Sequence, residues 1–278
     1  MALKVVVDSS SDIPEKVKDD FIIIPMPVII DGKSFAEGID IFPDRFYQDF
    51  KHYSEVPKTS QPNPQDILEV YEQVLKEGNE VVAIHLSSGL SSTYQTACMV
   101  KEMSSQPDKV HVVDSLGATI GFGLLAIYTA QIVKDKSWEE AEPEIIQVRD
   151  KMRYLFTPDH LEYLVKGGRL SKAAGFVGGL LNVKPLLHLQ NGKIEVFDKV
   201  RTRKSALHKI IETMKNDADE PENQIMAIAH SACPEEAEFL AEEIRAAIQV
   251  QDLLIGDIGC VVGSHTGPGT IALCYLAK

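Results

Sequence analysis

Small hydroxyl residues gather in short clusters directly after the apolar, strand-like runs of this 278-residue chain. The clusters are Ser9–Ser11, Thr59-Ser60, Ser87–Thr93, Ser115 and Ser264–Thr266. At the carboxyl edge of a parallel sheet, beside helix N-termini, such residues offer O–H and N–H donors that suit an anion. Ser and Thr are also the ordinary N-cap residues, so capping alone explains any single cluster. Several clusters on one edge predict an anion site.

One histidine lies among three glycines and a proline, in Gly263-Ser264-His265-Thr266-Gly267-Pro268-Gly269. This composition predicts a rigid loop between two strands that a ligand can approach closely. His265 can donate to an anion there, or act in acid–base or nucleophilic chemistry, and a purely structural loop histidine is the alternative. His85, His111 and His188 lie inside strand patterns and are expected to be structural, while His230 is a weaker site candidate.

The machinery of several enzyme classes is missing from the sequence. No phosphate loop, dinucleotide fingerprint, nucleophile elbow or metal-ligand spacing occurs. The cysteines at 98, 233, 260 and 274 are widely spaced, which predicts reduced thiols and neither a disulfide framework nor a metal site. The paired glycines Gly167-Gly168, between Lys166 and Arg169, form an anion clamp, shape a lid or simply end a helix with solvated charges.

Elements that position these residues can be read from the apolar pattern. In the first half, strands are predicted over 3–7, 80–86 and 110–113, with an irregular strand over 21–30. Helices are predicted over 43–53, 64–76 and 117–134, another follows Tyr94 and runs to about residue 103, and the segment 58–62 is predicted to be a loop. Regular alternation of strand and helix predicts a doubly wound, mainly parallel sheet.

The second half has a different pattern. Asn191-Gly192 separates strands predicted over 183–189 and 194–200, a strong hairpin signal. Further strands are predicted over 224–229, 253–262 and 270–276, with helices over 204–214 and 235–248 and a bridging amphipathic helix over 138–155. We therefore predict an α/β protein of two domains, residues 1–155 with the parallel sheet and 156–278 with a mixed or antiparallel one.

Charge and hydropathy narrow the function further. The net charge is −13 and the calculated pI is near 5.1, which disfavours a nucleic-acid partner, and the basic group Arg201, Arg203 and Lys204 is too small to reverse this. No apolar run approaches the roughly 20 residues that span a bilayer. The first residues enter a strand pattern instead of a charged leader, so we expect a cytoplasmic protein.

The chain resembles the DegV family of bacterial lipid-binding proteins over essentially its full length. The motifs that carry the resemblance are Val7-Asp8-Ser9-Ser10-Ser11-Asp12, Thr59-Ser60-Gln61-Pro62, Ser87-Ser88-Gly89-Leu90-Ser91, Leu161-Glu162-Tyr163-Leu164 with Gly167-Gly168-Arg169, Asn182-Val183-Lys184-Pro185, and Gly263–Gly269. Found in this order in one chain, they are specific as a set.

The resemblance implies a long-chain fatty acid held in a tunnel between two α/β domains, with no other cofactor. It implies that Thr59 and the Ser91/Ser92 pair hold the carboxylate, with His265 close by, so that the mouth carries neutral donors and no permanent cation. Ser92 departs from the family pattern, in which we expect glycine. Some relatives present the acid to a separate ATP-dependent kinase that makes acyl phosphate, and Arg169, Arg201 and Arg203 would then contact the kinase or the phosphate.

Three functions are thus open from the sequence. The first is a carrier that binds one fatty acid, has no turnover of its own and has an ATP-dependent kinase as its partner. The second is a phosphotransferase or a covalent-histidine enzyme that uses His265, although no phosphate loop supports it. The third is a DNA-binding regulator, which the acidic charge disfavours.

Overall fold

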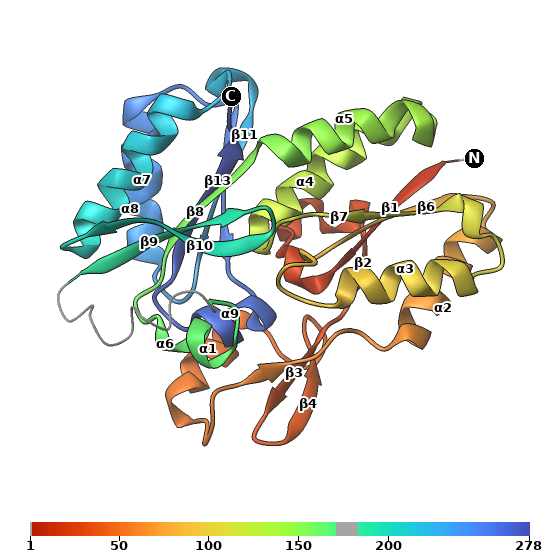
Figure 1. Ribbon diagram of the computed structural model, residues 1–278, viewed down its shortest axis with the longest axis horizontal. Helices are drawn as coiled ribbons and strands as arrows, with labels where there is room; N and C mark the ends of the chain where they lie inside the picture. Colours follow the sequence, from red (N-terminus) through yellow and green to blue (C-terminus); the bar gives the residue numbers. More distant parts are fainter. Residues whose placement is uncertain (1, 171–182) are drawn as a thin grey trace.

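The structure is a computed structural model that describes residues 2–170 and 183–278. Its first sheet has four parallel strands in the order β2-β1-β6-β7. The strands are β1 (Leu3–Asp8), β2 (Ile22–Ile24), β6 (Glu80–His85) and β7 (Val110–Asp114). Helices α2 (Pro64–Lys76) and α3 (Thr93–Met103) cover one face, and α4 (Thr119–Ile132) and α5 (Trp138–Lys151) cover the other (Figure 1). The predicted doubly wound sheet is confirmed.

A six-stranded sheet in the order β10-β9-β8-β13-β11-β12 forms the second half. Its strands are β8 (Met152–Thr157), β9 (Lys184–Gln190), β10 (Lys193–Val200), β11 (Ile225–His230), β12 (Asp252–Asp257) and β13 (Ile271–Leu276). Only β11 and β12 pair in parallel among these described strands. Helices α7 (Arg203–Asp217) and α8 (Pro234–Ala247) pack on one face. The mixed sheet and its hairpin at Asn191-Gly192 are confirmed.

The helix predicted over 138–155 is wrong at its carboxyl end. Helix α5 ends at Lys151, and β8 begins with the next residue. Both neighbours of β8, namely β13 and β9, are distant in sequence, so strand pairing overrides the helical pattern at this point. The predicted domain border between 155 and 156 therefore falls inside β8, after the chain has entered the six-stranded sheet.

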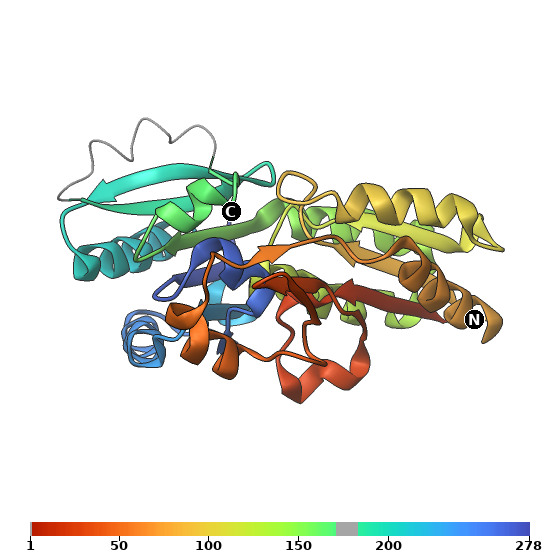
Figure 2. The ribbon, with the colours of Figure 1, turned by 90° about the horizontal axis from the view of Figure 1, so that it is seen from below.

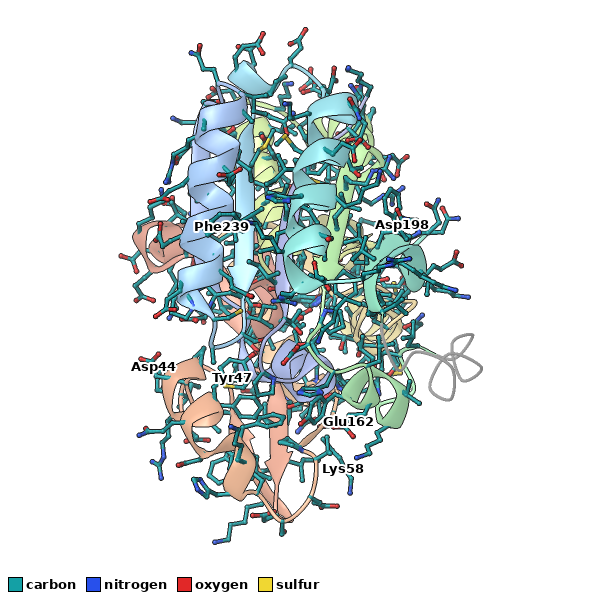
Figure 3. The ribbon with its side chains drawn as sticks, turned by 90° about the vertical axis from the view of Figure 1, so that its left-hand side faces the viewer. Asp44, Tyr47, Lys58, Glu162, Asp198 and Phe239 are labelled. Carbon is teal, nitrogen blue, oxygen red and sulfur yellow. The ribbon has the colours of Figure 1, made fainter. Side chains whose placement is uncertain are left out.

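A small third sheet, in the order β4-β3-β5, lies beside both halves. It contains β3 (Pro27–Ile30), β4 (Lys33–Ala36) and β5 (Lys58–Thr59), so Thr59 lies on a short strand and the predicted loop starts later. Helix α1 (Pro43–Asp49) follows β4, and its Tyr47 points inward while Asp44 faces solvent (Figure 3). The sheet packs near α9 (Cys260–Thr266) and α6 (Glu162–Lys166).

Helix α4 connects the two larger sheets. Its sequence is apolar around its whole circumference, which is typical of a helix buried on all sides. Ile120 and Leu124 pack against the six-stranded sheet, whereas Phe122 and Leu125 pack against the parallel one. Figure 2 shows the two halves side by side along the molecule. Within the described residues, no helix combines the length and the apolar character needed to cross a membrane.

Candidate functional site

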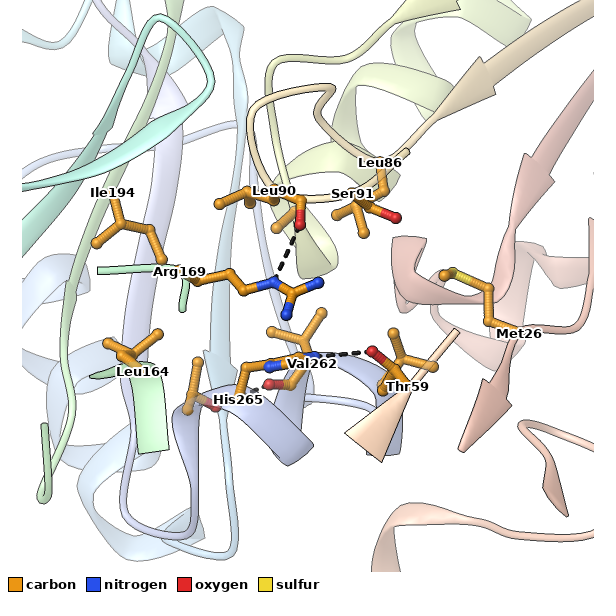
Figure 4. A pocket seen from close by; sticks show the side chains of 13 residues that line it. Met26, Thr59, Leu86, Leu90, Ser91, Leu164, Arg169, Ile194, Val262 and His265 are labelled. Carbon is orange, nitrogen blue, oxygen red and sulfur yellow. Dashed lines mark hydrogen bonds between the residues drawn. The ribbon is translucent and has the colours of Figure 1, made fainter. Parts of the chain in front are cut away.

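Four of the predicted site residues line one small cavity between the halves (Figure 4). They are Thr59 from β5, Ser91 from the turn before α3, Arg169 from the turn after α6, and His265 from α9. Apolar side chains complete the wall: Met26, Leu86, Leu90, Ala118, Leu164, Ile194, Val261 and Val262. The cavity has a volume of about 50 Å³. Donors from four separate segments thus converge on one point.

Thr59 and His265 are in direct contact, although 206 positions separate them in the sequence. The Thr59 Oγ1 atom lies 2.8 Å from Nε2 of His265, and Nδ1 is buried without a partner among the described residues. Burial, helped by the charge of Arg169, lowers the pKa of His265 to about 4. The ring is therefore neutral near pH 7 and donates one N–H.

The predicted loop around His265 is wrong, since residues 260–266 form helix α9 and β12 ends at Asp257. Residues 260–262 are apolar and β-branched in part, which resembles a strand continuing from residue 253. Tertiary contacts decide otherwise: the Tyr47 hydroxyl donates to the carbonyl of Ile258 at 2.8 Å, and Phe46 packs in the same apolar cluster as Cys260 and Val261. His265 thus lies in the last turn of a short helix.

The two neighbouring serines lie in different surroundings. Ser91 is partly buried and lines the cavity, and its Oγ lies 2.9 Å from Oγ1 of Thr93. Ser92 is exposed, does not line the cavity, and donates to Oε1 of Gln61 at the surface. Of this pair, Ser91 is therefore the one that can meet a ligand in the cavity.

Arg169 brings a positive charge into the site. Its Nε donates to the carbonyl of Leu90 at 3.1 Å and its Nη1 to the carbonyl of Gly167 at 2.6 Å. Nη2 donates to none of the described residues, and burial lowers the pKa of the guanidinium. The expectation of a mouth with neutral donors only is wrong, because a guanidinium remains charged at any physiological pH.

The other two arginines lie elsewhere. Arg203, at the start of α7, donates to Glu236, to the carbonyl of Thr157 at 2.7 Å and to the carbonyl of Gly269 at 2.7 Å, so its donors are used internally. Arg201 is exposed and makes no hydrogen bond or ion pair with the described residues. One residue of the sequence motifs, Asn182, lies outside the described part of the chain.

A second cavity of about 50 Å³ continues inward from the first. The two share Leu90, Ala118, Ile194 and Thr266, and the inner one is lined almost entirely by carbon: Tyr154, Phe156, Leu189, Ile258, Ala272 and Cys274 among others. The sequence analysis did not select these residues. Whether these side chains face the cavity depends on the strand register in β8 and β13 and on where α4 begins. No local sequence pattern defines either feature.

The other histidines named in the sequence analysis, His85, His111, His188 and His230, line neither of these cavities. His85 is fully buried between Asp8, 3.1 Å from its Nδ1, and Tyr71, 3.1 Å from its Nε2. His111 bonds to Glu80 and stacks on Trp138. His188 lies beside Phe197, and Nδ1 of His230 lies 3.3 Å from Asp257. In the described residues, no group of three or more His, Cys, Asp or Glu side chains is placed to hold a metal ion.

The chain was compared with known proteins. A model of the DegV family, described as uncharacterised protein, matches residues 2–278. Protein DegV of Bacillus subtilis is 34% identical, with 100% of both chains covered. A DegV family protein from Thermus thermophilus, solved for its fatty-acid binding, superposes with a TM-score of 0.93 at 29% identity and full coverage. A stearic-acid-binding protein from Eubacterium ventriosum gives a TM-score of 0.89 at 26% identity, with 100% of this chain and 99% of that chain covered.

Proposed function

The chain belongs to the DegV family, and from that premise we propose that it carries one long-chain fatty acid between its two halves. The carboxylate lies at Thr59, Ser91 and His265, and the acyl chain extends into the inner cavity. One observation carries the proposal: a cluster of hydrogen-bond donors opens directly into a cavity walled by carbon. An amphiphile with one polar end matches that arrangement. The related proteins solved as fatty-acid binders support it.

The energetics of such a ligand are favourable. Burial of about 14 methylenes at ~0.8 kcal/mol each supplies roughly 11 kcal/mol before ordering costs. A submicromolar affinity needs on the order of 8 kcal/mol, so the gross apolar contribution of the acyl chain is large enough to supply most of the affinity. The carboxylate must keep donors when it leaves water, and the hydroxyls, the imidazole and Nη2 of Arg169 offer them. The head group therefore fixes the orientation of the acid more than its affinity.

Binding requires the walls to separate. Two cavities of about 50 Å³ have room for a few water molecules but not for an acyl chain. Leu86, Leu90 and Ala118 belong to the first half, whereas Ile194, Phe156 and Ala272 belong to the second. We propose that the chain enters as the two halves move apart along this surface.

Calorimetric titration of delipidated protein with palmitate and with hexadecanol tests the head-group assignment. The alcohol has the same chain without the carboxylate, so it reports the apolar contribution alone. We expect palmitate to bind with submicromolar affinity and hexadecanol more weakly. Equal affinity for both would remove the carboxylate site, and no binding of either would remove the carrier function.

We further propose that the protein is cytoplasmic and has no turnover alone, and that it presents the acid to a kinase that transfers the γ-phosphoryl group of ATP to the carboxylate. The partly exposed Ser91 and Arg169, at the cavity opening, support access to that end of the ligand. The exposed Arg201 is the candidate for contact with the kinase. We expect Arg201→Ala to slow kinase-dependent acyl-phosphate formation, with Arg45→Ala on α1 as the control. Full activity of Arg201→Ala would argue against this surface.

A further inference from the structure

The motif Val7–Asp12 does not line the head-group cavity, yet its side chains bond to the segments that do. Oδ2 of Asp8 accepts from the backbone N–H of Leu86 at 2.9 Å, and Leu86 lines the cavity. The Ser9 hydroxyl accepts from the N–H of Met26 at 3.0 Å and donates to Oε2 of Glu37 at 2.5 Å. Met26 lines the same cavity. The motif thus supports two residues that line the cavity, through hydrogen bonds to their backbones.

The second carboxylate of the motif reaches helix α9. Asp12 accepts from the Thr119 hydroxyl at 2.5 Å, and its carboxyl group lies against the backbone of Gly259. Glu37 accepts from the N–H of Val261 at 2.8 Å. Two buried carboxyl groups from the first half therefore lie against the start of α9, in the second half, and Glu37 is hydrogen-bonded to it.

Helix α9 has no capping side chain of its own, because its N-cap residue is Gly259. A Cβ atom at that position would collide with Oδ1 of Asp12 and Oε1 of Glu37, so glycine permits the close approach. Free N–H groups at a helix start need acceptors, and Glu37 supplies one for Val261. A helix of seven residues has little stability alone, so outside contacts fix its position.

We infer that Asp12 and Glu37 are positioning residues of the ligand site: by fixing the start of α9, Glu37 through the N–H of Val261 and Asp12 through its close contact with Gly259, they hold His265 against Thr59. His265 lies in the last turn of that helix, and the helix is too short to absorb a displacement along its length. The effect on ligand affinity rests on the proposed function. The effect on the geometry of His265 does not.

The protonation of the pair agrees with a hydrogen-bonding role. Burial, together with repulsion from Glu37, raises the pKa of Asp12 well above its ordinary value, and burial raises the pKa of Glu37. A full negative charge on both groups is therefore unfavourable. We infer that the two groups act on α9 through hydrogen bonding and close contact and not through their charge. A neutral amide with the same shape can replace Glu37, because it keeps an oxygen for Val261.

The test measures the titration of the His265 ring by NMR in protein without ligand. In the native protein we expect a pKa near 4. In Glu37→Ala, helix α9 shifts and the ring gains solvent, so we expect the pKa to rise by more than about one unit toward 6.5. Palmitate affinity is expected to fall at least about tenfold. Glu37→Gln is expected to restore both values, which a general loss of stability would not explain.

Leu240→Ala is the control, since this buried residue of α8 lies in the core on the other face of the six-stranded sheet. It should lower the melting temperature and leave the His265 titration unchanged. Native titration of His265 in folded Glu37→Ala would overturn the inference. If Glu37→Ala does not fold, Ser9→Ala, which removes the donor that orients Glu37, replaces it under the same criterion. Failure of the native protein to bind palmitate would remove the proposed function alone.

Discussion

The contact between Thr59 and His265 determines which donors are left for a ligand. One hydrogen is used in that contact: a neutral ring protonated at Nε2 donates to Oγ1 and leaves the threonine hydroxyl free to rotate its hydrogen toward an incoming carboxylate. Arg169 adds a donor with a permanent charge, and Ser91 adds a hydroxyl on the opposite side. The site therefore combines weak, reorientable donors with one strong one.

Thr59→Val removes one donor while keeping the shape of the side chain. A hydrogen bond to a charged group contributes about 1.5–3 kcal/mol, so palmitate affinity should fall roughly 10- to 100-fold. Thr213→Val on α7 is a matched control, because that hydroxyl donates to a backbone carbonyl far from the site. Titration calorimetry measures both. An affinity for Thr59→Val equal to that of the control would exclude Thr59 from the head-group site.

His265 should make stability depend on pH in a defined window. Its folded pKa of about 4 lies below the unfolded value of about 6.5, so the unfolded chain binds the proton more tightly. Its contribution to stability is complete above pH 6.5, falls between 6.5 and 4, and amounts to on the order of 3 kcal/mol. Urea unfolding of the native protein and of His265→Gln from pH 8 to 4.5 measures it. Parallel curves for the two proteins would contradict the buried, neutral ring.

At the scale of elements, helix α9 is the part that the sequence predicted least well. His265, selected as a site candidate, lines the cavity, but its helix was predicted as a strand followed by a loop, because Val261 and Val262 continue the apolar run of β12. Strand β8 was missed for a similar reason, since its partners come from distant parts of the chain. Regular β-α alternation and the Asn191-Gly192 hairpin are local signals, and these predictions were confirmed.

The packing of α9 on α1 gives an element-scale prediction. A Cβ at Gly263 would collide with the Tyr47 hydroxyl, so Gly263→Ala should lower the free energy of unfolding by roughly 1–3 kcal/mol. Helix propensity alone predicts the opposite sign, by about 1 kcal/mol. Adding Tyr47→Phe removes the atom nearest to the added Cβ and leaves the ring carbon Cζ, at 2.9 Å, as its nearest neighbour, so the double variant should be more stable than the sum of the single effects predicts. Additive effects in denaturant unfolding would contradict this contact.

At the scale of the molecule, the six-stranded sheet, the start of α4, the end of α9 and the turn that contains Leu90 enclose the inner cavity. Composition and alternation indicated two α/β parts, but the cavity lining was not predictable, because it combines Ala118 at the start of α4 with Phe156 and Ala272 on two paired strands. The third small sheet was also missed, since its strands are short and Pro25 and Pro27 suggested an irregular segment. Such features arise only when distant segments assemble.

Ala272→Leu should shorten the space for the acyl chain. Ala272 is buried on β13 and lines the inner cavity, and the added carbons occupy room that a long chain needs. We expect the affinity for palmitate to fall at least about tenfold more than that for decanoate, because only the longer chain reaches this depth. Competition binding with both acids measures the ratio and cancels any general loss of stability. An unchanged ratio would place the acyl chain elsewhere.

The central claim is that the walls between the two halves separate to hold one fatty acid by its chain and its carboxylate. Mass spectrometry of the freshly purified protein, recorded under native and then denaturing conditions, tests it most directly. We predict one added mass per chain under native conditions, released on denaturation as a free acid of about 14 to 18 carbons. A protein that carries no such mass, and takes up none after incubation with equimolar palmitate, would contradict the account.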